Sequence, residues 1–332
     1  LQHLQDQVSP EEEPSSDELT RQLTDRINES LSDCARLERQ LSDERPKLYE
    51  VQNAYRKAIW PWFGQSWFRC RALHKPRGYP GDHVTLSAIY DGQVKSRGLG
   101  GYLDRYFLAT TLARAVRGRM RAVRQFLLEE LNRRTGDVTI LNVACGPCRE
   151  YTDHFLPQHD GNICLVCVDN DQEALDFVQS CVAPLIADNI RCKFVRYNAL
   201  RMSSARRNVE NFGHPDNIYS VGLCDYLSER ILVPILRGWR ESLGDNGIVY
   251  VAFKDAERYE TPEYQWLVDW FFLQRTESEC RRLFAASGYD MKHLELGRDM
   301  TGVILNYVGR SPVREVIRVD HADKVPPVSY TH

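Results

Sequence analysis

Long hydrophobic runs and an excess of charge of one sign are both missing from this sequence. No apolar stretch reaches the roughly eighteen residues that a membrane-spanning helix requires, and no apolar core after a basic start marks a secretion signal. The 43 Lys and Arg residues nearly balance the 46 Asp and Glu residues, giving a formal net charge of −3. Such a balance gives no overall attraction to nucleic acid or to an anionic membrane. We therefore expect a soluble, non-secreted, cytoplasmic protein without either partner.

A regular cysteine framework is also missing. The ten cysteines are irregularly spaced and several fall in strand-like segments, which is typical of free thiols in a reducing compartment. One spacing imitates a zinc site, because Cys145, Cys148, Cys164 and Cys167 match C-x2-C-x15-C-x2-C. Cys164 and Cys167 lie in one predicted strand, however, where residues three apart point to opposite faces. We therefore favour buried thiols over a zinc site or a redox pair, and predict no metal.

The N-terminal part of the chain is predicted to be mostly helical. Residues 1–16 contain several Glu and Pro residues and are expected to form a flexible tail. Ser16 or Asp17 can cap a helix in which apolar residues recur every three or four positions as far as Leu41. This apolar stripe either packs on the body of the protein or forms a homodimer seam. Residues 17–135 are accordingly expected to form a helical cap domain.

From residue 136 to 310, strand-like and helix-like segments alternate, which predicts a parallel sheet covered by helices. Strands are expected at 138–144, 163–169, 190–197, 218–223 and 247–253, followed by an antiparallel hairpin over 289–310. A nucleotide-dependent dehydrogenase would continue with a parallel sixth strand instead. The predicted fold class is therefore α/β, with a Rossmann-like class I methyltransferase sheet that ends in an antiparallel hairpin. Residues 311–332 are expected to form a C-terminal tail.

The turn after the first predicted strand carries the first candidate binding residues. LNVACGPCRE, residues 141–150, places Gly146 where bare backbone and a helix N-terminus can approach a cofactor. Ala144 and Cys148 stand where glycines are usual, so the fingerprint GxGxxG is absent and a pyrophosphate has less room. The same pattern can also arise from an ordinary strand–turn–helix connection.

Later strand ends add suitable residues in a matching order. Asp169 ends the second strand, where a carboxylate can accept both ribose hydroxyls; alternatively it caps the next helix, as Asn170 or Asp171 also could. Asn198 follows the third strand, beside the expected adenine, unless it is part of a plain turn. Together these positions predict S-adenosylmethionine as the cofactor. The predicted contacts are Ala144, Cys145, Gly146, Asp169, Asn170, Asn198, Ala199, Gly222 and Leu223.

Four segments carry a resemblance to a known family. HKPRGYPGD (74–82), CGPCRE (145–150), YSVGLCDYL (219–227) and DWFFLQRTESE (269–279) resemble, in this order, the methyltransferases that make 3-hydroxy fatty acid methyl esters as bacterial extracellular signals. Fungal carboxylic acid O-methyltransferases, which act on small dicarboxylates, are similar. The resemblance spans about residues 70–310. It implies a carboxyl O-methyltransferase with a helical N-terminal lid that forms a dimer. Cys224 replaces a Phe of the family pattern, so the acceptor is expected to differ.

A carboxylate acceptor requires a clamp rather than a base, because it is already ionised at neutral pH. The predicted catalytic residues are Arg77, His74, Tyr226 and Arg275. Arg77 is the preferred clamp because its fork matches a carboxylate, although a structural salt bridge to Asp82 or another acid is the alternative. His74 would be the base for a hydroxyl or amine acceptor, unless it only packs or lies on the surface.

The acceptor is expected to be apolar or aromatic. The segment 264–279 is rich in aromatic residues and is predicted to form either a substrate-facing helix or part of the core. Substrate contacts are predicted for Tyr79, Tyr102, Asp225, Trp266 and Trp270. Three other functions stay open on the sequence: methylation of a hydroxyl or amine, an NAD(P)-dependent reductase on a similar sheet, and a non-catalytic protein that has kept the fold.

Overall fold

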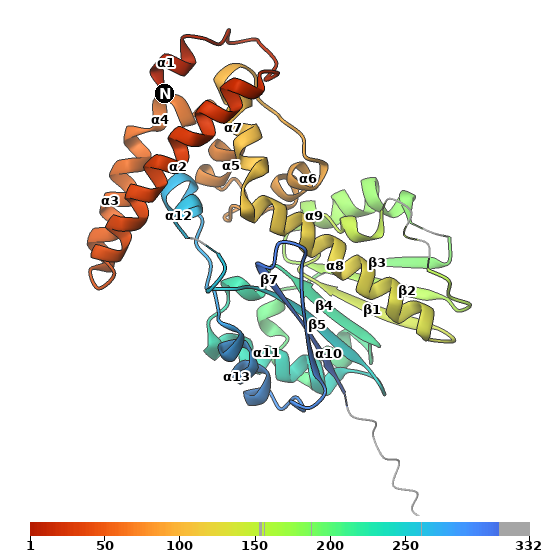
Figure 1. The fold of residues 1–332 in the computed structure, drawn as a ribbon. Coiled ribbons are helices and arrows are strands. Elements are labelled where there is room, and N and C mark those ends of the chain that lie inside the picture. The colour runs from red at the N-terminus through yellow and green to blue at the C-terminus, as the bar shows by residue number, and fades with distance from the viewer. Residues whose placement is uncertain (153–154, 156, 187, 260, 312–332) are drawn as a thin grey trace, which may run out of the picture.

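The computed structural model describes residues 1–332 apart from 153–154, 156, 187, 260 and 312–332. One seven-stranded sheet has the order β3-β2-β1-β4-β5-β7-β6 (Figure 1). The first five strands are parallel, and β7 runs antiparallel to its neighbours β5 and β6. The strands are β1 (Val138–Val143), β2 (Ile163–Asp169), β3 (Ile190–Arg196), β4 (Asn217–Val221), β5 (Ile248–Lys254), β6 (Leu294–Arg298) and β7 (Ile304–Arg310). This confirms the predicted fold class, including the terminal antiparallel hairpin.

Helices cover both faces of the sheet, which explains why its central strands are mainly apolar and buried. On one face, Val123 and Leu127 of α8 (Thr111–Arg133) pack against Ile140 of β1, together with residues of α9 (Gln172–Phe177). On the other face, Leu141 of β1 packs with Trp239 of α11 (Glu229–Ser242). The same side carries α13 (Glu277–Ala286), and α10 (Ala205–Phe212) packs on α11.

The N-terminal helices form a separate layer above the sheet (Figure 1). They are α1 (Gln2–Gln5), α2 (Asp17–Gln40), α3 (Arg45–Ala58), α4 (Trp60–Phe63), α5 (Trp67–His74), α6 (His83–Asp91) and α7 (Gly98–Ala109). Ser16 caps α2, since its side chain accepts a hydrogen bond from Leu19 N at 3.2 Å. Leu23 and Ile27 of α2 are buried, and the helix contacts α7 and α12 (Pro262–Val268). The apolar stripe therefore packs on the body of the same chain.

Residues 1–16 differ from the expected flexible tail. Leu4 is buried, and Gly98 N at the start of α7 donates a hydrogen bond to Glu12 O at 2.8 Å. Ser16 N likewise donates to the Tyr102 hydroxyl at 3.1 Å. Tyr102 is therefore part of the cap core and not a substrate contact, because its polar end faces the N-terminal segment.

The boundary between cap and sheet differs from the predicted one at residue 135. The second half of α8 packs on the sheet, while α12, from the middle of the C-terminal part, lies among α2, α3 and α5 (Figure 1). The predicted C-terminal tail lies, apart from Ser311, outside the described residues. Within the described parts of the chain, no helix combines the length and apolarity needed to cross a membrane.

Candidate active site

A cleft of about 680 Å³ lies at the carboxyl ends of the five parallel strands. This is the edge at which open α/β sheets bind ligands, and the volume is in the range of small-molecule sites. One end is polar, with Gly146, Asp169 and Asn198, and the other end contains aromatic and cationic side chains. The segment 76–81, between α5 and α6, also lines the cleft; we call residues 75–82 the roof segment.

The turn after β1 has left-handed backbone at three positions, and only one of them is a glycine. Ala144, Gly146 and Cys148 all have positive φ, of 56°, 52° and 51°. A non-glycine residue in this region costs about 1–3 kcal/mol, so the surrounding packing holds the turn in place. Ala144 and Gly146 line the cleft. Cys145 does not; it is buried in the hydrophobic core on the α8 face, which corrects its prediction as a cofactor contact.

Asp169 lies directly beside this turn. Its Oδ2 accepts a hydrogen bond from Gly146 N at 3.0 Å, and its Oδ1 accepts one from Asp171 N at 3.0 Å. Asp171, and not Asp169, caps α9, by accepting from Glu173 N. The capping alternative for Asp169 is therefore wrong. Burial raises the pKa of Asp169, although the backbone donors oppose this.

Asn198 lines the cleft and also stabilises a turn. Its Oδ1 accepts a hydrogen bond from Leu200 N at 3.0 Å and caps the short 3-10 helix Ala199–Arg201. The turn reading therefore holds, and the same turn presents Asn198 and Ala199 to the cleft. Asn170, Gly222 and Leu223 also line the cleft.

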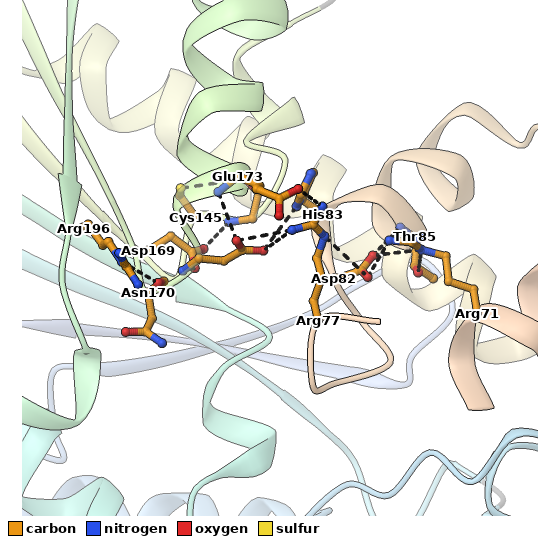
Figure 2. A network of polar contacts seen from close by, with 12 residues as sticks. Arg71, Arg77, Asp82, His83, Thr85, Cys145, Asp169, Asn170, Glu173 and Arg196 are labelled. Atoms are coloured by element: carbon orange, nitrogen blue, oxygen red, sulfur yellow. Dashed lines mark hydrogen bonds and ion pairs between the residues drawn. The ribbon is translucent and has the colours of Figure 1, made fainter. Parts of the chain in front are cut away.

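The roof segment is fastened to the sheet domain by Arg77. Figure 2 shows the polar network that joins Arg77 to residues following β2. The guanidinium forms ion pairs with Asp171, at 3.3 Å, and with Glu173, while Asp82 is held mainly by Arg71 at 2.7 Å. Arg77 lines the cleft, but its charge is already paired. The structural salt bridge is therefore the reading that the geometry supports, with Asp171 and Glu173 as the main acids.

The aromatic end of the cleft is built from Tyr226, Trp270 and Phe272. Trp270 Nε1 donates a hydrogen bond to the Tyr226 hydroxyl at 2.7 Å, and the Trp270 and Phe272 rings are 5.4 Å apart. Gly81 in the roof segment lies against Trp270, where a Cβ would come within 2.9 Å of the indole. Because Gly81 has no side chain, the roof segment packs directly against Trp270.

Lys254, at the carboxyl end of β5, is a cleft residue that sequence reasoning missed. Its Nζ donates to Asp225 Oδ2 at 2.6 Å and lies 3.8 Å from the centre of the Phe272 ring. Burial lowers the pKa of Lys254 to about 8, and the Asp225 charge opposes that shift. Asp225 does not line the cleft but stands behind Lys254, which corrects its prediction as a substrate contact. A lysine ending the otherwise apolar segment IVYVAFK was the available signal.

Several predicted residues lie outside the cleft. Arg275 donates to the carbonyl of Cys224 at 3.0 Å and to that of Leu227, so it holds the turn that carries Tyr226. The His74 ring ends α5 and packs edge-on against Trp60, 5.8 Å away. Trp266 is buried in α12 and donates to Glu38 Oε2 at 2.8 Å.

The residues predicted to line the site thus separate into two groups. The structure brings together in the cleft Arg77, Tyr79, Ala144, Gly146, Asp169, Asn170, Asn198, Ala199, Gly222, Leu223, Tyr226 and Trp270. It leaves outside His74, Tyr102, Cys145, Asp225, Trp266 and Arg275. Besides Lys254, sequence reasoning missed Arg119 of α8. Nothing in the sequence distinguished Arg119 from the other arginines of that helix.

The cysteines of the zinc-like spacing lie on two sides of β2. Cys148 and Cys167 are buried on the α8 face with their Sγ atoms 3.8 Å apart, whereas Cys164 packs against the core on the α11 face. In the part of the chain that the structure describes, no three His, Cys, Asp or Glu side chains are grouped so as to hold a metal ion.

No protein-family model and no curated protein sequence matches the chain. Among solved structures, it is similar to a possible exported protein from Bordetella parapertussis, with 18% identity and a TM-score of 0.57 over 70% of this chain and 80% of that one. It is also similar to magnesium protoporphyrin IX methyltransferase from Synechocystis with bound SAM, with 7% identity and a TM-score of 0.43 over 60% of this chain and 83% of that one. A 1,6-didemethyltoxoflavin-N1-methyltransferase from Burkholderia thailandensis is similar with 16% identity and a TM-score of 0.39 over 58% of this chain and 78% of that one. The likeness to the Bordetella protein shows a shared fold.

Proposed function

We propose that the chain is an S-adenosylmethionine-dependent methyltransferase that converts a carboxylate of an apolar or aromatic small molecule to its methyl ester. The observation that carries this proposal is the placement of Asp169 and Gly146, which meet at the carboxyl ends of β2 and β1 inside a cleft of about 680 Å³. A carboxylate beside bare glycine backbone at these two positions is suited to a nucleoside sugar and an amino-acid group.

The remaining strand ends support the same cofactor. Asn198 and Ala199 would border the adenine, Asp169 the ribose hydroxyls, and Gly222 and Leu223 the methionine part. The positive φ of Ala144 puts a methyl group where dinucleotide-binding turns carry glycine, which favours this ligand over NAD(P). When bound, S-adenosylmethionine supplies an activated methyl group on a sulfonium.

The opposite end of the cleft supports the acceptor class. Trp270 and Phe272 provide an apolar surface, and Lys254 provides a positive charge beside them. A carboxylate acceptor is ionised at neutral pH and needs no general base, so the work of the chain is to orient the acid and exclude water. His74, the candidate base for a hydroxyl or amine, lies outside the cleft, which favours the carboxylate further.

Calorimetry tests the cofactor. We expect micromolar binding of S-adenosylmethionine and S-adenosylhomocysteine and much weaker binding of NADP⁺. Asp169→Ala should weaken binding by about 1–3 kcal/mol because it leaves ribose hydroxyls without a partner. Asp176→Ala, on the exposed side of α9, is the matched control and should change nothing. A preference for NADP⁺ would overturn the cofactor assignment.

Labelled cofactor tests the acceptor. A panel of fatty, hydroxy-fatty and aromatic acids, offered beside phenols and amines, should yield label that mild base releases, as a methyl ester requires. Base-stable label confined to amines, phenols or carbon would contradict the carboxylate assignment while leaving the cofactor assignment intact.

A further inference from the structure

Two cationic side chains from distant segments line the same end of the cleft. Arg119 comes from α8 and Lys254 from the end of β5, and the two residues are 3% and 2% exposed. Each positive charge is unfavourable for the other, and the charge of Arg119 contributes to the lowered pKa of Lys254. Burying two like charges is costly unless counter-charges are close by.

The described residues supply a close counter-charge for only one of these cations. Asp225 pairs with Lys254, its Oδ2 2.6 Å from Nζ. No carboxylate oxygen of the described chain forms an ion pair with Arg119 within 4.0 Å, and Arg119 Nε has no hydrogen-bond partner. Burial raises the pKa of the nearby Tyr90 hydroxyl and the Arg119 charge opposes this shift, but a phenol hydroxyl brings no counter-charge. Arg119 is thus a buried cation without an ion-pair partner on the wall of the cleft.

The nearby buried acid Glu150 is already engaged. Its Oε1 accepts hydrogen bonds from the Tyr219 hydroxyl and from Asn142 Nδ2, the latter at 3.0 Å. Burial raises the pKa of Glu150, while Arg119 and these donors oppose the shift. Glu150 therefore stays turned toward Tyr219 and Asn142 and does not close an ion pair with Arg119.

Gly222 leaves the guanidinium of Arg119 accessible from the cleft. A Cβ at this position would lie 3.2 Å from Arg119 Nη2 and 3.3 Å from Nη1, and the φ of +130° also disfavours any other residue. Both residues line the cleft. The bare backbone thus leaves room beside the guanidinium for a group of the ligand. A planar anion fits this position well, because the guanidinium fork can donate two parallel hydrogen bonds.

We infer that Arg119 is the anchor of a carboxylate-binding site at the β4/β5 end of the cleft, where the ion-paired Lys254 adds to the positive potential. The inference rests on the proposed function for the identity of the ligand, since either the methionine part of the cofactor or the acceptor acid can bring the carboxylate. The Phe272 ring lies 3.8 Å from Lys254 Nζ, and such apolar surroundings strengthen a charge-assisted hydrogen bond.

Calorimetry with three kinds of probe tests the site. S-adenosylhomocysteine carries a carboxylate, whereas 5′-methylthioadenosine has the same nucleoside without the amino-acid part. Decanoate and 4-phenylbutyrate serve as acid probes, each titrated with and without saturating S-adenosylhomocysteine. The variant is Arg119→Gln, and the control is Arg121→Gln, on the same helix but exposed.

We expect Arg119→Gln to weaken at least one carboxylate ligand about tenfold or more and to leave 5′-methylthioadenosine within about twofold. Loss confined to S-adenosylhomocysteine assigns the site to the cofactor, and loss confined to the acids assigns it to the acceptor. If the wild type binds no carboxylate probe, or if Arg119→Gln binds every probe as the wild type does, the inference is wrong. Failure of the proposed function is seen separately, as absent binding of 5′-methylthioadenosine to the wild type.

A second variant guards against a folding defect. Arg119→Lys keeps the charge but loses the fork, so it should recover part of the lost affinity while 5′-methylthioadenosine binding stays unchanged. Thermal unfolding of both variants shows whether each is folded at the temperature of titration. Equal loss of carboxylate and nucleoside affinity in folded Arg119→Lys and Arg119→Gln would mean that Arg119 supports the fold and not a carboxylate.

Discussion

The guanidinium of Arg77 meets the carboxylate of Asp171 with Nη1 3.3 Å from Oδ2, although 94 positions separate the two residues in the chain. The same carboxylate caps α9, because its Oδ1 accepts a hydrogen bond from Glu173 N. One acid therefore joins the roof segment to the helix that follows Asp169. A ligand beside Asp169 would lie under this junction.

Arg77→Met should weaken S-adenosylhomocysteine binding about three- to tenfold, because losing a partly buried ion pair of about 1 kcal/mol releases the roof segment. Calorimetry measures the change. Arg26→Met removes an exposed pair on α2 and should have no effect. Unchanged cofactor affinity together with weaker acid binding would contradict this role and make Arg77 the acceptor clamp after all.

Asp225→Asn should lower the free energy of unfolding by about 3–5 kcal/mol at pH 6.5, because it leaves buried Lys254 without its counter-charge. Urea denaturation gives the value, with exposed Asp25→Asn as the control.

The loss of unfolding free energy in Asp225→Asn should be smaller at pH 9 than at pH 6.5. The folded pKa of Lys254 is about 8, below the ordinary value of 10.5, so the cost of burying its charge is fully present below pH 8 and is relieved as the pH rises toward 10.5. Without Asp225 this pKa falls further, so relief begins at a lower pH in the variant than in the wild type. If the difference in unfolding free energy between the wild type and Asp225→Asn stays constant from pH 6.5 to 9, the Lys254 charge is not its cause.

Trp266→Phe and Trp270→Phe should have different effects, although only three residues lie between them. Trp266→Phe loses the bond to Glu38 in the cap and should reduce stability by about 1–3 kcal/mol without changing ligand affinity. Trp270→Phe frees the Tyr226 hydroxyl at the cleft and should alter binding of the acid probes with a smaller loss of stability. Denaturation and calorimetry on both variants test this, and an effect of Trp266→Phe on acid binding would contradict it.

Purified protein should contain no stoichiometric zinc. Cys164 faces the α11 side of β2 and Cys167 the α8 side, so one tetrahedral ion cannot reach both without breaking the strand. Elemental analysis measures the metal content. One zinc per chain that disappears in Cys164→Ala would overturn this reading of β2.

The sequence by itself determined the sheet domain and the polar end of the cleft. Apolar segments of strand length alternating with helical ones predicted β1 to β5 and the hairpin, because periodicity and length are local properties. Asp169 and Gly146 were also within reach of sequence reasoning. Each ends or follows a parallel strand, and such ends meet at one edge whatever the rest of the chain does.

Only the tertiary structure decided which side chains complete the cleft. Trp266 and Trp270 stand in the same aromatic segment, yet the end of α12 at Val268 turns the first toward α2 and the second toward Tyr226. The roles of Arg77 and Arg119 also depended on long-range packing. The charge of Arg77 is paired by Asp171, far along the chain, whereas none of the described acids forms an ion pair with Arg119. Side-chain direction and ion pairing depend on how distant elements pack, and no local pattern in the sequence records that packing.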